Sequence, residues 1–136
     1  FRAVNAYAAL IKKEGFNNTI HRHYLIRDGL RESLKALDLK LLVTKDSYAS
    51  PTVTSFIPHE LTYIKSTLKS RFNITIAGGQ GKLKGTILRI GHMGKVSPFD
   101  ILSVVSALEI ILTDYRKVNY IGKATLKFTE VIQHDA

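Results

Sequence analysis

The chain has 136 residues, 45% of them hydrophobic, so it can bury a core without help from disulfides or metal ions. It contains no cysteine, which excludes disulfides, thiolate zinc sites, iron–sulfur ligation and a cysteine nucleophile. The 20 Lys and Arg residues outnumber the 11 Asp and Glu residues, and the formal charge of +9 favours anionic partners. We expect one soluble, cytoplasmic domain over residues 1–136.

The chain shows no membrane or export signal. No apolar run approaches the roughly 20 residues that cross a bilayer, and the N-terminus lacks the order of a signal peptide. The chain begins at Phe1, and its only methionine is Met93. We therefore expect a piece of a larger protein, cut upstream of Phe1.

The N-terminal third is predicted to be helical. Residues 1–14 carry apolar side chains at helical spacing, and Gly15 supplies a stop. Residues 17–37 form a second amphipathic pattern, for which Asn17, Asn18 and Thr19 are candidate caps. The apolar face of this second helix is predicted to contain Ile20, Tyr24, Arg27, Leu30, Leu34 and Leu37.

The middle of the chain alternates between strand and helix patterns. Residues 37–43 and 52–57 have the period and β-branched content of strands. Residues 60–72 predict a helix, residues 74–76 a short strand and residues 86–90 a further strand. In the last of these, the alternation places Leu88 and Ile90 on one face and Arg89 on the other.

Two helices close the chain. The sequence SPFD at 97–100 has a capping serine, a proline at the first helical position and an acidic residue three positions on. The apolar run behind it predicts a helix buried on more than one side, and a last helix is expected from Asn119. The element order predicts a two-layer α+β domain, with helices packed on a small, largely antiparallel sheet of three to four strands.

Several short motifs carry little chemistry. The glycines at 79, 81 and 85 have the spacing G-x-G-x-x-x-G and precede a strand, whereas a phosphate loop precedes a helix. Ser66 and Lys69 match S-x-x-K without the companion motifs of that enzyme class. His21 and His23 are two apart on a helix and cannot share a metal ion, and no metal site is expected. His59 and His134 are expected to be exposed, while His92 follows Arg89 closely enough to be a candidate site residue.

Arg89 stands out because a guanidinium near the end of a strand is anchored by the sheet while its fork stays free for a carboxylate. A structural salt bridge is the competing interpretation. A Gly-x-x-Gly turn is expected directly after it, at Gly91 and Gly94, whereas the glycines at 79, 81 and 85 are expected to serve a tight turn or the close approach of a ligand.

Three segments together are distinctive. They read YASPTVT at 48–54, RFNITIAGGQG at 71–81 and, after Gly85, LRIGHMG at 88–94. In this order they resemble the C-terminal small domain of class V aminotransferases, fold-type I pyridoxal-phosphate enzymes that include alanine–glyoxylate and serine–glyoxylate aminotransferases. Residues 17–136 would be that domain, and residues 1–14 resemble part of the helix that connects it to a large domain.

The resemblance implies a substrate site. Arg89 would bind the α-carboxylate of the substrate during amino transfer from alanine, serine or aspartate to a 2-oxo acid such as glyoxylate or pyruvate. Candidate cleft-lining residues are Gly78, Gly79, Gly81 and His92. The implied cofactor is pyridoxal 5′-phosphate, held by a large domain outside this chain, and the implied assembly is a homodimer.

The family's catalytic lysine, its aspartate partner for the pyridine nitrogen and its phosphate-binding residues belong to the large domain. We assign no catalytic residue here, and the chain alone is expected to be inactive. A basic module that binds nucleic acid is the alternative function, although the basic residues are scattered over predicted helices without an aromatic platform. A family member that has kept the fold and lost catalysis is a third possibility.

Overall fold

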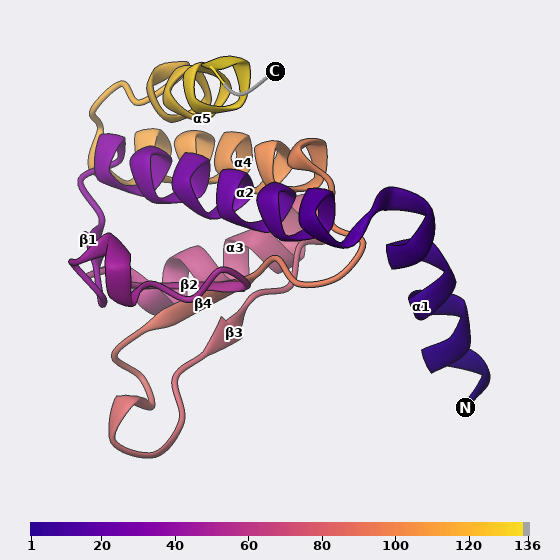
Figure 1. Ribbon diagram of the computed structural model, residues 1–136. Coiled ribbons are helices and arrows are strands. Elements are labelled where there is room, and N and C mark those ends of the chain that lie inside the picture. Colours follow the sequence, from indigo (N-terminus) through magenta and orange to yellow (C-terminus); the bar gives the residue numbers. More distant parts are fainter. Residues whose placement is uncertain (135–136) are drawn as a thin grey trace.

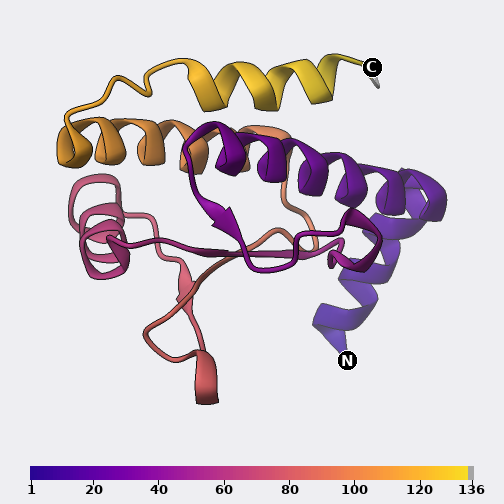
Figure 2. The same cartoon turned by 90° about the vertical axis from the view of Figure 1, so that its left-hand side faces the viewer.

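Helices cover one face of a small antiparallel sheet in the computed structural model, which describes residues 1–134 (Figure 1). The helices are α1 (Arg2–Glu14), α2 (Phe16–Ala36), α3 (Leu61–Phe72), α4 (Pro98–Arg116) and α5 (Lys123–His134), and the strands are β1 (Lys40–Leu41), β2 (Val53–Ile57), β3 (Ala77–Gly78) and β4 (Leu88–Gly91). The α+β class is confirmed. Figure 2 shows that α5 forms a further layer, on the far side of α2 and α4 from the sheet.

The sheet has the order β1-β2-β4-β3, and every neighbouring pair is antiparallel. Arg89 in β4 lies opposite Ser55 of β2 on one side and Ala77 of β3 on the other. The strand that carries Arg89 is therefore central, which fixes its backbone through ladders on both edges.

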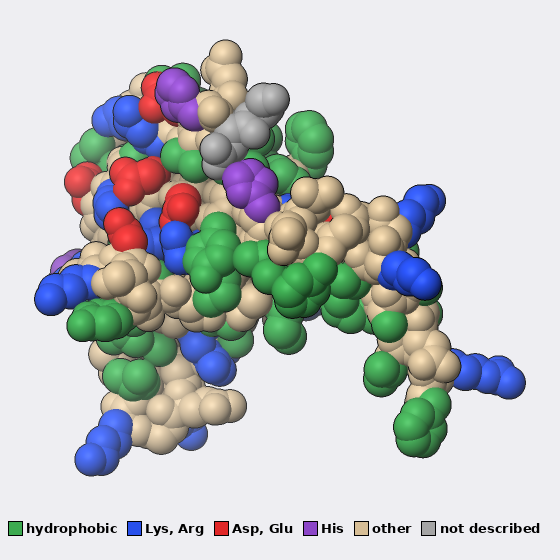
Figure 3. All heavy atoms as spheres, viewed as in Figure 1, with side chains coloured by type: hydrophobic (Ala, Val, Ile, Leu, Met, Phe, Trp, Pro, Cys, Tyr) green, Lys and Arg blue, Asp and Glu red, His purple; other side chains and the backbone are tan. Residues whose placement is uncertain are grey.

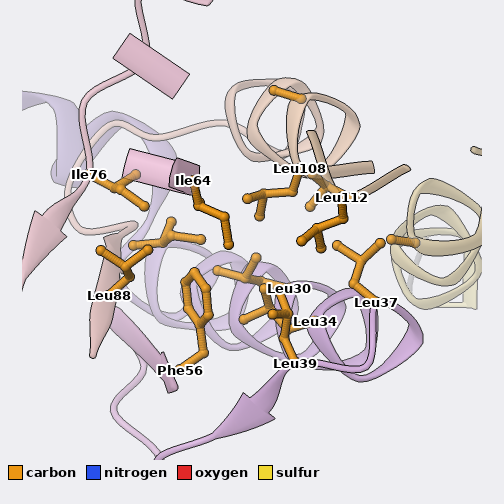
Figure 4. Packing of buried hydrophobic residues seen from close by; sticks show 14 of the residues in the cluster. Leu30, Leu34, Leu37, Leu39, Phe56, Ile64, Ile76, Leu88, Leu108 and Leu112 are labelled. Atoms are coloured by element: carbon orange, nitrogen blue, oxygen red, sulfur yellow. The ribbon is translucent and has the colours of Figure 1, made fainter. Parts of the chain in front are cut away.

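The core lies between the sheet and the helices. Phe56 and Leu88 project from the sheet toward Leu30 and Leu34 of α2, and Leu108 of α4 joins them (Figure 4). All five side chains are fully buried. Burial of this kind contributes roughly 1.5 to 3 kcal/mol for each large aliphatic or aromatic side chain. One face of β2 and β4 is therefore held against the helices.

Helix α2 starts at Phe16, with Gly15 as its N-cap residue, and no side-chain hydrogen bond caps it. The predicted caps lie inside the helix, where Asn18 donates to the Glu14 carbonyl. The predicted apolar face is right for Leu30 and Leu34, but Ile20 and Tyr24 are exposed. The buried face instead begins with Thr19, His23 and Ile26, because this end of α2 packs against polar loop groups.

Two predicted strands need correction. The strand expected at 37–43 shrinks to Lys40–Leu41, because Leu37 caps α2 and Asp38 has a left-handed φ of 54°. The strand expected at 74–76 is displaced to Ala77–Gly78, because Asn73 ends α3 in the left-handed conformation and Ile74 donates back to the Leu68 carbonyl. The capping box at Ser97 and Asp100 is confirmed.

The last helix begins at Lys123, after a loop in which Gly122 has a φ of 82°. Its start is set by Glu109 of α4, a buried carboxylate that accepts from the backbone N–H groups of Gly122, Ala124 and Thr125 at 3.0, 2.7 and 2.7 Å. A negative charge at a helix N-terminus is favourable and satisfies donors that have no partner within the helix. A carboxylate distant in sequence therefore caps α5.

Helix α1 projects from the body and has no buried residue (Figure 1). Its apolar side chains Phe1, Val4, Tyr7 and Leu10 are exposed. Among residues 1–134, no helix combines the length and the apolar character needed to cross a membrane.

Replacing Glu109 with Gln should lower the free energy of unfolding by about 2 to 3 kcal/mol, because the neutral amide presents an NH₂ group to backbone donors and loses the charge-assisted bonds. Urea denaturation measures this effect. Glu130→Gln is the matched control, since Glu130 is in an exposed ion pair with Lys127 and should change stability by less than about 1 kcal/mol. Equal effects of the two substitutions would contradict the capping role.

Candidate functional site

Arg89 lies on the face of the sheet that no helix covers. Its neighbours Leu88 and Ile90 are buried toward the helices, whereas Arg89 is half-buried and Gly91 is exposed. The predicted alternation of β4 is confirmed. The guanidinium therefore occupies the open face, where a strand in a two-sided core would carry a hydrophobe.

The guanidinium is anchored at one end only. Its Nε–H donates to the Gly78 carbonyl at 2.8 Å, a bond across the β3–β4 pair. Among residues 1–134, no carboxylate lies within ion-pair distance of Arg89 and neither Nη atom has a hydrogen-bond partner. The competing interpretation, a structural salt bridge within the described residues, is thus not supported.

A pocket of about 340 Å³ surrounds this group. It is lined by Val53, Thr75, Ile76, Ala77, Arg89 and Gly91. Arg89 is the only charged residue in the lining, and the remaining side chains are small or apolar. An anion entering the pocket would meet a permanent cation with up to four free N–H donors, in the planar arrangement that suits a carboxylate.

The glycine loop lies beside this pocket rather than in it. Gly78 belongs to β3 and contributes the carbonyl that holds Arg89. A Cβ on Gly79 would lie 2.0 Å from the Leu83 carbonyl oxygen. The absence of a side chain at Gly79 therefore allows the backbone of Leu83 to pack against it. Gly81 has a φ of 53° and is exposed in a 3₁₀ turn. Neither Gly79 nor Gly81 lines the Arg89 pocket.

His92 lies on the helix side of the sheet, away from Arg89. It is fully buried, and its Nε2 is 2.9 Å from the Thr54 hydroxyl. Its Nδ1 has no hydrogen-bond partner within residues 1–134. Burial, with a smaller contribution from the nearby His23, lowers the pKa of His92 to about 4, so the ring is neutral at physiological pH. The structure does not bring His92 to the open face.

Sequence reasoning did not identify Arg22 as a positioned group. Its Nη1 donates to the carbonyls of Gly94 and Val96, and its remaining nitrogens bind the Glu14 carboxylate. The hydrogen bonds from Arg22 hold the pKa of Glu14 at about 2. No local pattern signals this contact, because Arg22 and Gly94 are 72 residues apart.

The space-filling view shows hydrophobic side chains along the underside of the body, between projecting α1 and the loop that follows β3 (Figure 3). Val53, which lines the pocket, is an exposed hydrophobic residue, and so is Met93, two positions beyond Gly91 in the chain. The Arg89 guanidinium thus lies in a pocket whose other lining residues within 1–134 are small or apolar. Residues 1–134 contain no cluster of three or more metal-ligating side chains.

Several known proteins are similar to this chain in sequence and in fold. The chain is 41% identical to the protein named soluble hydrogenase, small subunit, of Synechococcus sp. (strain PCC 6716), over 88% of the chain and 32% of that protein. It is 34% identical to an uncharacterized aminotransferase of Methanocaldococcus jannaschii, over 82% of the chain and 30% of that protein. A scan against models of known families finds no match.

The structural comparison is decisive for the fold. Pyridoxamine–pyruvate aminotransferase of Mesorhizobium loti superposes with a TM-score of 0.86 at 27% identity, over 94% of this chain and 34% of that protein. Serine–glyoxylate and alanine–glyoxylate aminotransferases also match. The chain is a homologue of the class V aminotransferases. It spans about a third of the length of these aminotransferases, and the resemblance inferred from its motifs is confirmed.

The pH dependence of stability should report the buried His92. Between about pH 6.5 and 4 the unfolded chain binds a proton at this residue that the folded chain excludes. Lowering the pH through this window should therefore lower the free energy of unfolding, by on the order of 2 to 3 kcal/mol.

Urea denaturation at several pH values measures this dependence, with His92→Gln as the comparison. Gln retains a neutral partner for the Thr54 hydroxyl and cannot titrate, so its curve should be flatter through the same window. Parallel curves for the two proteins would contradict the assignment. Exposed histidines such as His59 contribute equally to both curves and cancel in the difference.

Proposed function

We propose that residues 1–136 are the substrate-carboxylate-binding segment of a pyridoxal-phosphate-dependent aminotransferase. The observation that carries this proposal is the free guanidinium fork of Arg89 in an otherwise uncharged pocket on the open sheet face. Kinship with aminotransferases supports the reaction class. The substrate would be a small amino acid, such as alanine, serine or aspartate, with glyoxylate or pyruvate as the acceptor.

Arg89 is suited to this role by its charge and its shape. An arginine stays protonated in a closed cleft, and its planar fork matches the two oxygens of a carboxylate. Each charge-assisted hydrogen bond contributes roughly 1.5 to 3 kcal/mol. The Nε bond to Gly78 orients the fork before the substrate arrives, so less rotational freedom is lost on binding.

The cofactor would be held elsewhere in a longer polypeptide. No lysine lines the Arg89 pocket, so the residues present fit the substrate and not the covalent anchor of pyridoxal phosphate. When bound, that cofactor supplies the electron sink for amino transfer. The role of this segment is to hold the substrate by its carboxylate so that the amino group meets the cofactor, a proximity contribution.

The partners follow from this division of labour. A large domain of the same enzyme would cover the open sheet face and meet α1, and the complete enzyme would be a cytoplasmic homodimer. Residues 1–136 alone would be inactive, because they provide one half of a site.

A hydrogenase role is suggested by the names of two relatives, one from Synechococcus and one from Anabaena cylindrica. Iron–sulfur clusters are held by cysteine thiolates. The chain has no cysteine, so this segment offers no such ligand. Nucleic-acid binding is not supported by the comparisons, and many of the basic side chains are in ion pairs, among them Arg31 with Asp46 and Arg116 with Glu60.

Replacing Arg89 with Ala in the longer polypeptide should lower kcat/KM for the amino donor by about 100-fold or more, because two charge-assisted hydrogen bonds are lost. The kcat/KM of Arg89→Lys should lie between those of the original protein and Arg89→Ala, because lysine keeps the charge and loses the planar fork of the guanidinium. Arg71→Ala, at an exposed ion pair with Asp114, is the matched control. Unchanged kinetics in Arg89→Ala would refute the proposal.

Gly91→Ala tests the pocket itself. A Cβ at Gly91 meets no atom within 4 Å, and it would point from β4 into the Arg89 pocket. The variant should fold with a free energy of unfolding within about 0.5 kcal/mol of the original and show a raised KM. Gly79→Ala should instead destabilise the loop, because its Cβ would overlap the Leu83 carbonyl. A normal KM in Gly91→Ala would place the substrate elsewhere.

A further inference from the structure

Two adjacent residues of α2 form hydrogen bonds with the backbone N–H and carbonyl of Gly94, which lies in the segment that follows β4. The Gly94 N–H donates to Nε2 of His23 at 3.1 Å, and the Gly94 carbonyl accepts from Nη1 of Arg22 at 3.0 Å. Arg22 also donates to the Val96 carbonyl at 2.8 Å. We call this set of contacts the Gly94 clamp.

The clamp depends on the side-chain chemistry of His23. Its Nδ1 lies 2.6 Å from the Thr19 carbonyl, which can only accept, so Nδ1 carries the proton. Nε2 is therefore a bare acceptor, and it faces the Gly94 N–H. His23 is 7% exposed and Gly94 is half-buried, so loss of this acceptor would leave a partly buried donor without its protein partner.

The clamp acts close to the pocket. Beyond Gly91, the N–H of His92 extends the ladder by donating to the Thr52 carbonyl. Gly94 then turns the chain with a φ of 83°. The strand end that carries Arg89 and Gly91 is thus held by β2 on one side and by the Gly94 clamp immediately after it.

The clamp also reaches α1. The Glu14 carboxylate, at the end of α1, accepts hydrogen bonds from Nε and Nη2 of the same Arg22, at 2.6 and 3.0 Å. It also accepts a hydrogen bond from the Thr19 hydroxyl. The bend between α1 and α2 is therefore tied to the loop that follows β4. Motion of α1 would be transmitted to that loop through one guanidinium.

We infer that Arg22 and His23 are positioning residues for carboxylate binding, because they fix the end of β4 from which Arg89 and Gly91 form the pocket. This inference rests on the proposed function for its kinetic consequence. Its structural consequence, the coupling of His23 to the geometry of Arg89, stands by itself.

The experiment compares His23→Leu with His23→Gln. Leucine removes the acceptor, while the Gln side chain places an oxygen where Nε2 lies and should restore the bond. In the longer polypeptide, His23→Leu should raise KM for the amino donor on the order of tenfold with a smaller change in kcat, since misplacement of a binding group weakens binding first. His23→Gln should return KM toward its original value. His59→Leu, at an exposed histidine, is the control.

A second readout does not need activity. In the 136-residue chain, the NMR signal of the Arg89 Nε–H, identified by its loss in Arg89→Lys, reports the bond to Gly78. His23→Leu should shift this signal and speed its hydrogen exchange, and Arg22→Met should do the same. An unaltered Arg89 signal and an unaltered KM, with only a lower melting temperature, would overturn the inference. If Arg89→Ala leaves KM unchanged, the proposed function fails. The NMR signal alone then tests whether the Gly94 clamp positions the Arg89 side chain.

Discussion

The structure depends on one constraint, the alternation of side chains along β4. Leu88 and Ile90 enter the hydrophobic core, and this burial fixes the strand so that Arg89 must point to the opposite face. A one-residue slip would bury a guanidinium among aliphatic side chains, at a cost of several kcal/mol. The same packing that stabilises the fold therefore presents a charge on the open face.

The open face gives the molecule an asymmetry. Helices α2 and α4 cover the other side of the sheet, and α5 stacks on them (Figure 2), so the packing of these three helices lies away from Arg89. This arrangement suits a segment whose site is completed by other residues. The aminotransferases with which the chain shares its fold are about three times longer, in keeping with the proposed division between carboxylate binding here and cofactor binding elsewhere.

Buried polar groups organise the molecule where hydrophobic packing does not. Glu109 starts α5, Arg116 joins Glu60 of α3 to the end of α2 through the Leu37 carbonyl, and the Gly94 clamp joins the α1–α2 bend to the end of β4. Each is a charged or polar side chain that satisfies backbone groups far away in sequence. Such contacts specify angles between elements, because hydrogen bonds are directional whereas apolar burial is not.

The sequence by itself determined the helices with strong periodicity, the capping box at Ser97, the face of Arg89 and, through its motifs, the family. The first three features depend on neighbours within a few residues, and the family depends on three segments spread over residues 48–94. Tertiary structure decided the rest: the start of α5, set by Glu109; the short β1, set by the left-handed turn at Asp38; and the burial of His92 behind the sheet. It also brought Arg22 to Gly94. The physical reason is that contacts between residues far apart in sequence leave no local pattern in a single chain.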